Sequence, residues 1–237
     1  MNDTITLTGK SNREFLDQYA RAGRIGLAGG TTLVDHAIRR AERHVHPDKK
    51  WGVWSHAFFF EGERLDGHHW VIESDVQIAR KHIRLGVQEN RISKYYDEEL
   101  YSTLAVLDFG LSEAQVTGMV REGLELLANR ARYSLRELVG TWIALRHPHL
   151  RSGDNLLARD QSFYCSAFVE FLFRKAGLEL LPGVDVKNTT PEEIARSPLP
   201  HASYILRRRP VVGKFTKLAI RLRRHVRSRS KSKETVP

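Results

Sequence analysis

Two short aromatic-rich segments joined by a tight turn constrain the fold of this chain more than any other feature. The segment VWSHAFFFEG, residues 53–62, is short, strongly apolar and closed by a glycine, which is typical of a buried strand. The next residues, ERLDG, contain Asp66-Gly67, a dipeptide that favours a hairpin turn. HHWVIESD, residues 68–75, is then typical of the returning strand. We therefore expect two buried antiparallel strands.

Other segments predict helices and a further strand. Ser112 and Gln115 have the spacing of a capping box, and they open a helix that reaches about residue 131. GLAGG, residues 26–30, is interpreted as a turn because glycine runs interrupt regular structure. Residues 76–100 have no clear pattern. Helices are also expected over residues 31–44, 134–146, 165–176 and 190–197, and a strand over 102–109.

The positive charge of the chain is concentrated at its C-terminal end. The net charge is +10, yet residues 201–237 hold twelve basic residues and one acidic residue, so the remainder is close to neutral. This distribution disfavours a uniformly basic nucleic-acid-binding domain. We expect an N-terminal extension over residues 1–24, one globular domain over 25–200, and a basic amphipathic helix with a disordered tail over 201–237.

The basic helix expected over residues 211–226 carries apolar residues on one side and cations beside or opposite them. One interpretation is contact with an anionic membrane surface, and another is docking on the body of the protein. Contact with nucleic-acid phosphates ranks third. The cations concerned are Lys214, Lys217, Arg221 and Arg224.

Composition also disfavours several classes of protein. One cysteine cannot form an internal disulfide, and the first 15 residues lack the apolar core of a signal peptide. No apolar run approaches the ~20 residues needed to cross a bilayer. The expected location is therefore the cytoplasm, with attachment to the inner membrane as an alternative. The eleven histidines are scattered without metal-ligand spacing, so no metal or other cofactor is expected.

The single cysteine, Cys165, begins an amphipathic run that ends at Gly177. A thiol in the first turn of a helix meets unpaired backbone N–H groups and the positive end of the helix dipole. Both favour the thiolate, which is the nucleophilic form. The alternative is a small buried core residue, because free cysteine is often fully buried. The position of Cys165 alone leaves both interpretations open.

A thiolate nucleophile needs a base, and that base needs an orienting group. His56 and Glu73 lie on the two strands expected to pair, so their side chains could meet on one face. The alternatives are a hydrogen-bonded core histidine at position 56 and a solvated carboxylate at position 73. The adjacent His68 and His69 are further candidates for the third polar group.

The order of these motifs resembles the circularly permuted papain-like cysteine hydrolases of the NlpC-type superfamily. The YiiX-like branch is the most similar, and the lecithin–retinol acyltransferases are distant relatives. The pattern is a histidine before strand residues and a glycine, a glutamate on the next strand, and Cys-Ser at the start of a core helix. His56, Glu73, Cys165 and Ser166 match it. The resemblance covers roughly residues 25–200 and does not extend to the basic tail. The family often has a Gly-Asp motif near the start of the domain, which RIGLAGG in this chain does not reproduce.

The resemblance implies an α+β, permuted papain-like fold in which a small antiparallel, barrel-like sheet packs on the helix that carries the cysteine. It also implies acyl transfer through a thioester on Cys165, with His56 as the base and Glu73 as the orienting group. The oxyanion would accept from the backbone N–H of Cys165. Tyr164 is a candidate second donor, although a core role is favoured for it.

Three functions therefore compete. The first is a thiol hydrolase of amide or ester bonds that acts on a small-molecule, peptide or lipid acyl substrate. The second is a membrane-associated lipid acyltransferase or thioesterase, and the third is a binding module that keeps the fold without turnover. The same three residues suit each of the acyl substrates.

Overall fold

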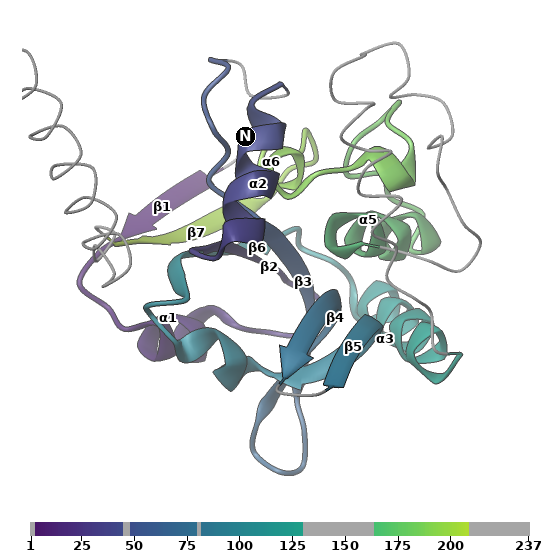
Figure 1. Cartoon of the computed structure of the whole chain (residues 1–237). Helices are drawn as coiled ribbons and strands as arrows, with labels where there is room; N and C mark the ends of the chain where they lie inside the picture. Colours follow the sequence, from purple (N-terminus) through teal and green to yellow (C-terminus); the bar gives the residue numbers. More distant parts are fainter. Residues whose placement is uncertain (1–2, 45–47, 80–81, 130–163, 209–237) are drawn as a thin grey trace, which may run out of the picture. The chain divides into compact units, whose positions relative to one another are not determined.

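A seven-stranded mixed sheet forms the centre of the computed structural model, which describes residues 3–44, 48–79, 82–129 and 164–208 (Figure 1). The strand order is β1-β7-β6-β2-β3-β4-β5, and every neighbouring pair is antiparallel except β1 and β7, which are parallel. The strands are β1 (Asp3–Leu7), β2 (Ile25–Gly30), β3 (His56–Glu63), β4 (His69–Ala79), β5 (His82–Arg91), β6 (Tyr101–Asp108) and β7 (Ala202–Arg207).

The sheet confirms the α+β class, but the expected barrel-like closure is wrong. β1 and β5 are its two edges, and no pairing joins them within the described residues. The parallel pair β1–β7 extends the sheet on the side away from the β3–β4 hairpin. Both strands lie outside residues 25–200, and the boundaries expected for the domain stay a prediction. The chain divides into the compact units Met1–Arg207 and Arg208–Pro237, and all the elements described belong to the first.

Helices cover both faces of this sheet (Figure 1). α5 packs against β3 and β4, and α3 lies beside α5 and also contacts β5. On the other face, α1 packs against the short helix η2 and against β7. The helices are α1 (Asn12–Tyr19), α2 (Leu33–Ala41), η1 (Glu42–His44), η2 (Ile92–Tyr96), α3 (Glu113–Ala128), α5 (Cys165–Lys175), η4 (Val186–Asn188) and α6 (Pro191–Ile194). None of the described helices combines the length and apolar character needed to cross a membrane.

The alternation of β3 divides the interior into two hydrophobic cores. Ala57 and Phe59 face the core that contains α5, whereas Phe58 and Phe60 face the core that contains α1 and Tyr95. Successive strand residues point to opposite faces, so an apolar residue at each position is required when both faces are covered. The unbroken apolar run therefore fits a central strand, and the predicted antiparallel hairpin with β4 is confirmed.

The glycine run at residues 26–30 is a buried strand, so its interpretation as a turn is wrong. A Cβ atom at Gly26 would lie 2.1 Å from the Phe58 ring, and one at Gly30 would lie 2.2 Å from the Asp35 carboxylate. Glycine is thus required in β2 because large neighbouring side chains lie directly on its backbone.

The expected capping residues are confirmed where the structure describes them. The side chains of Thr32, Ser112 and Thr190 accept backbone N–H bonds at the starts of α2, α3 and α6. The helix predicted over residues 134–146 and the basic helix over 211–226 lie outside the described residues. The strand β5 falls in the segment that had no clear pattern.

Candidate active site

Cys165 is the first residue of α5, the helix that packs on the centre of the sheet. It is a free cysteine and only 5% exposed. The side chain of Tyr164, at the N-cap, makes no capping bond to this first turn. The helix start that the sequence predicts at Cys165 is therefore confirmed.

His56 and Glu73 are brought into direct contact by the β3–β4 register. The pairing of Phe59 with Ile72 places Glu73 opposite Phe58, on the face that also carries His56. The distance from His56 Nε2 to Glu73 Oε2 is 2.6 Å. Glu73 is fully buried, and His56 is 13% exposed at its side chain. The interpretation of Glu73 as a solvated residue is wrong, because nothing of its side chain reaches solvent.

His56 also interacts with Cys165, so it connects the sulfur to the carboxylate. Burial by itself disfavours the imidazolium, but the charge of Cys165, a hydrogen bond with Cys165 and the hydrogen bond with Glu73 outweigh burial. Together they raise the pKa of His56 well above its ordinary value. Cys165 and Glu73 therefore both act on the His56 ring, although the three residues come from separate segments of the sequence.

Glu73 is surrounded by donors that the sequence did not reveal. Asn90 Nδ2 and Lys94 Nζ each donate to Glu73 Oε1 at 2.7 Å, and the Tyr95 hydroxyl donates to Oε2. Burial alone would raise the pKa of Glu73, but Lys94 and His56 outweigh burial and hold this pKa well below its usual range. The carboxylate of Glu73 is therefore ionised and held in one position.

These donors come from β5 and from η2, which follows it directly. Asn90 pairs across β4–β5 with Val71, two residues before Glu73, so the two side chains share one face. One sequence signal could have suggested a third strand here. It is the group of polar residues Asn90, Lys94 and Tyr95, which follows the expected pair of strands.

Glu42 and Glu192 form a buried pair of carboxyl groups, and the charge of Cys165 acts on Glu42. Glu42 is 1% exposed and its Oε1 accepts the Glu192 N–H at 3.1 Å, whereas its Oε2 has no partner among the described residues. The Oε2 atoms of Glu42 and Glu192 converge at Gly52, where an added Cβ would lie 2.4 Å and 3.1 Å from them. Gly52 thus leaves the space in which two carboxyl groups meet.

Electrostatics link Glu42 to the candidate site. Burial is the main cause that raises the pKa of Glu42 well above its usual range. The charges of Glu192, Cys165 and Glu193 raise it further, while the backbone hydrogen bond from Glu192 opposes them. Sequence reasoning missed Glu42, because it follows an amphipathic helix in a segment that resembles a surface.

The other residues named from the sequence have defined positions. The Tyr164 hydroxyl bonds to the carbonyl oxygens of Lys187 and Thr189 at 2.6 Å and 2.9 Å, and the Ser166 hydroxyl donates to Thr189 at 2.8 Å. Both hydroxyl groups thus hold the 187–189 segment, which fits the core role favoured for Tyr164. His68 is exposed at the hairpin turn and makes none of the contacts to His56.

His69 lies at the start of β4, at the hairpin end away from His56. It therefore does not replace Glu73 as the third group. The cations of the basic tail, Lys214, Lys217, Arg221 and Arg224, lie outside the described residues, and their membrane or phosphate contacts stay a prediction.

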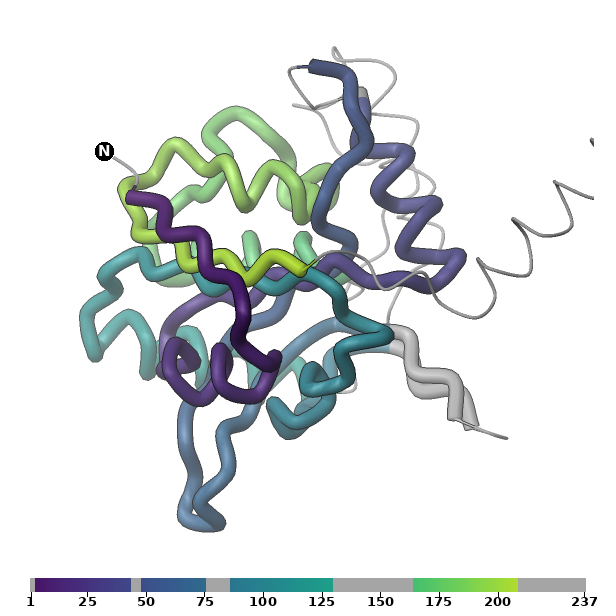
Figure 2. The backbone as a smooth tube through the Cα atoms, turned by 90° about the vertical axis from the view of Figure 1, so that its left-hand side faces the viewer, coloured from purple at the N-terminus to yellow at the C-terminus, as the bar shows by residue number. Residues whose placement is uncertain are grey.

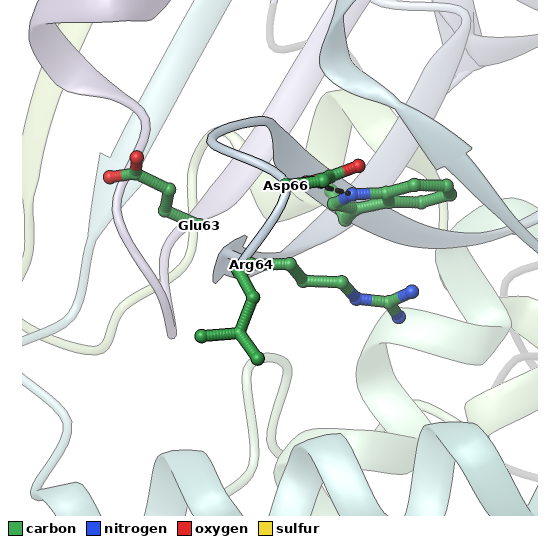
Figure 3. Close-up of a pocket in the computed structure, with 5 residues that line it drawn as sticks. Glu63, Arg64 and Asp66 are labelled. Atoms are coloured by element: carbon green, nitrogen blue, oxygen red, sulfur yellow. Dashed lines mark hydrogen bonds between the residues drawn. The ribbon is translucent and has the colours of Figure 1, made fainter.

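A shallow hollow opens at the β3–β4 turn, far from these residues (Figure 3). Trp70 packs there under the Arg64 guanidinium, 4.5 Å from the ring centre. Glu63 ends β3 and His56 begins it, so the two are separated by roughly 23 Å of extended strand. The turn projects from the body in Figure 2. The hollow is therefore not the place where Cys165 would meet a substrate.

Comparison with known proteins finds a distant structural similarity. No family model matches the chain, and no curated protein matches it. A crystal structure described as the metalloprotein YiiX from Escherichia coli O157:H7 is similar, with 13% identity and a TM-score of 0.49. The alignment covers 78% of this chain and 96% of that one. The expected link to YiiX-like proteins and the papain-like permutation both stay predictions.

Proposed function

We propose that this chain is a cysteine hydrolase that cleaves an amide or ester bond through a thioester on Cys165. The observation that carries this proposal is the 2.6 Å hydrogen bond between His56 Nε2 and Glu73 Oε2, together with the electrostatic interaction of Cys165 with His56. A nucleophile, a base and an orienting carboxylate in contact form the arrangement that acyl transfer requires.

In the first step the Cys165 thiolate attacks the acyl carbon, and the carbonyl electron pair moves to oxygen. The Cys165 backbone N–H, at the start of α5, is the candidate donor to this oxyanion. Collapse of the intermediate breaks the bond to the leaving amine or alcohol, which receives the proton held by His56. Glu73 stabilises the imidazolium and, since its Oε2 accepts from Nε2, leaves Nδ1 for the sulfur.

In the second step water attacks the thioester. His56, now neutral, removes a proton from the water, and the acid leaves as the sulfur recovers its electron pair. An amine or alcohol in place of water would give transfer instead of hydrolysis. An acyl group retained on Cys165 would identify the substrate class directly. Intact-mass analysis of the full chain isolated from cells is the measurement that would detect this group.

The rate of Cys165 alkylation by iodoacetamide, followed by mass spectrometry, tests the proposal. An ordinary thiol with a pKa near 8.5 is about one-thousandth thiolate at pH 5.5. We expect Cys165 to be alkylated at least tenfold faster than such a thiol at this pH, and His56→Ala to remove the advantage. His36→Ala, at an exposed position of α2, is the matched control and should label like the wild type.

The same experiment can contradict the proposal. If the wild-type protein and His56→Ala share one rate and one pH profile, the imidazole does not activate the sulfur. Cys165→Ser shows that the label reports on this thiol, since it is the single cysteine of the chain.

A further inference from the structure

Three groups around Glu73 have the arrangement of a metal site. One ligand atom each from His56, Glu73 and Asp75 lie within 4.8 Å of one another. Zinc binds imidazole nitrogen and carboxylate oxygen at about 2.0–2.2 Å, so three ligands of one ion lie about 3.5–3.8 Å from one another. An approach of about 1 Å by the most widely separated pair would therefore bring the three atoms around a divalent ion.

The cation position between the two carboxylates is already filled by the chain itself. Lys94 Nζ lies 2.7 Å from Glu73 Oε1 and 2.6 Å from Asp75 Oδ2. The side chain of Lys94 is 17% exposed, and its ammonium lies 5.3 Å from the centre of the Tyr95 ring. The ammonium cannot share this position with a metal ion, because two cations at this separation repel each other strongly in a poorly hydrated site.

Within the described part of the chain, the other groups that contact Glu73 carry no permanent positive charge. Asn90 and Tyr95 complete the contacts of Glu73 with uncharged donors. His56 contributes a positive charge only when it is protonated. Lys94 is therefore the permanent counter-charge of a buried carboxylate that also faces a second one.

We propose that the Lys94 ammonium occupies the cation position of the His56–Glu73–Asp75 cluster, so that Lys94 positions the orienting carboxylate and keeps a latent divalent-metal site closed. The exclusion of metal rests on the contacts of Lys94 alone. The positioning role rests in addition on the proposed function, since it concerns the carboxylate that orients His56.

Zinc binding by the full chain tests the exclusion. We use isothermal titration calorimetry with Zn²⁺ in a Cys165→Ser background, because a thiolate would bind zinc by itself. The background protein should show no site at this cluster. Adding Lys94→Ala should create one, with at least tenfold tighter binding than the background, and adding Asp75→Asn to that variant should remove it.

Lys94→Arg is the matched control, since a guanidinium keeps the charge and should keep the site closed. Equal zinc binding by the background and the Lys94→Ala protein, whether strong or absent in both, would overturn the proposal. Should Lys94→Ala fail to fold, Lys94→Gln removes the same charge with less loss of packing, and the same comparison applies.

A spectroscopic readout tests the positioning role separately. The His56 Nε2 proton in the 2.6 Å contact with Glu73 should give a strongly downfield imidazole proton resonance. We expect Lys94→Ala to remove this resonance and Lys94→Arg to retain it, while the fold measured by circular dichroism stays intact. A resonance unchanged in Lys94→Ala would overturn the positioning role, and neither result depends on whether Cys165 turns over a substrate.

Discussion

Two glutamates, Glu73 and Glu42, are almost equally buried, yet their pKa values are shifted in opposite directions. Glu73 is 0% exposed and Glu42 is 1% exposed. The pKa of Glu73 is far below the usual range of a carboxyl, and the pKa of Glu42 is well above it. Burial therefore does not decide the charge of a carboxyl in this protein.

The difference comes from the partners of each group. Glu73 has the ammonium of Lys94, the imidazole of His56, an amide and a hydroxyl within hydrogen-bond distance. Glu42 has one backbone N–H and faces the like charges of Glu192, Glu193 and Cys165. Desolvation penalises both anions, and only in Glu73 do opposite charges and donors outweigh the penalty.

The comparison teaches how neighbouring groups shift the pKa values of two buried carboxyls in opposite directions within one protein. The lowered pKa of Glu73 suits it to stabilise an imidazolium. The raised pKa of Glu42 favours its neutral form relative to an ordinary carboxyl, which lessens the negative charge acting on Cys165.

The largest expected effect is the loss of stability in Glu73→Gln. This change leaves the Lys94 charge without its buried partner, which typically costs about 3–5 kcal/mol. Because the folded pKa of Glu73 is lowered, its contribution is present above the unfolded value of about 4.3 and disappears as pH falls through the folded value. Urea unfolding of the wild type and of Glu73→Gln at pH 7 and pH 3 measures the loss of stability and its dependence on pH.

Glu63→Gln is the control for this prediction, since Glu63 is exposed at the end of β3 and should change stability by less than about 0.5 kcal/mol. Equal unfolding midpoints for the two variants at pH 7 would show that the donors around Glu73 do not stabilise its charge.

Glu42→Gln should increase the stability of the protein, whereas Glu73→Gln decreases it. Because the folded pKa of Glu42 is raised, the stability that Glu42 contributes is fully present below about pH 4.3 and is lost as pH rises through the folded value. An uncharged amide avoids this loss, so the variant should gain about 1–3 kcal/mol at pH 9 and little at pH 4.

Thermal unfolding at pH 4 and pH 9 measures this gain, which corresponds to about 2–4 °C per kcal/mol for a chain of this size. The exposed Glu99→Gln serves as the control. A variant less stable than the wild type at pH 9 would mean that Glu42 is charged and paired.

Cys165→Ser should lower the pKa values of both His56 and Glu42, and this effect should be smaller than those of the two glutamate substitutions. The negative charge of Cys165 raises the pKa of both His56 and Glu42, so a neutral serine should lower both. NMR titration of the histidine ring protons and of the glutamate side-chain carbons measures the shifts. His36 should titrate identically in both proteins, and an unchanged His56 would contradict the contact between ring and sulfur.

The smallest effect is expected for Arg196→Ala. Arg196 Nη2 lies 3.5 Å from Glu192 Oε1, but its side chain is 33% exposed, so solvent weakens the pair to less than about 1 kcal/mol. Glu192 retains the Val53 N–H at 2.7 Å. Urea unfolding of Arg196→Ala measures this effect, with Arg196→Lys as the control. A loss of more than about 2 kcal/mol in the free energy of unfolding would mean that the pair of Glu42 and Glu192 depends on Arg196.

Residues with a local sequence signal were predicted well. The β3–β4 hairpin has its turn dipeptide, α3 has its capping box at Ser112, and the chain contains a single cysteine at a helix start. His56 and Glu73 were named because a hairpin brings its two strands together whatever the rest of the fold does. By contrast, GLAGG was misinterpreted, because the Phe58 ring that requires Gly26 lies on another strand.

Lys94, Tyr95 and Glu42 could not be predicted in the same way. Lys94 and Tyr95 reach Glu73 only because β5 pairs with β4 and η2 then turns over the sheet. Glu42 is buried only because α6, about 150 residues further along the chain, places the Glu192 N–H against it.

The amino-acid sequence by itself determined the elements whose pattern is local: the hairpin, the capped helices, and the chemical identity of the thiol, the imidazole and the carboxylate. Only the tertiary structure decided which of these groups are charged, and that its seven described strands form an open sheet. The physical reason is that periodicity and capping act over a few residues, whereas the pKa of a buried group depends on neighbours that the fold brings from distant parts of the chain.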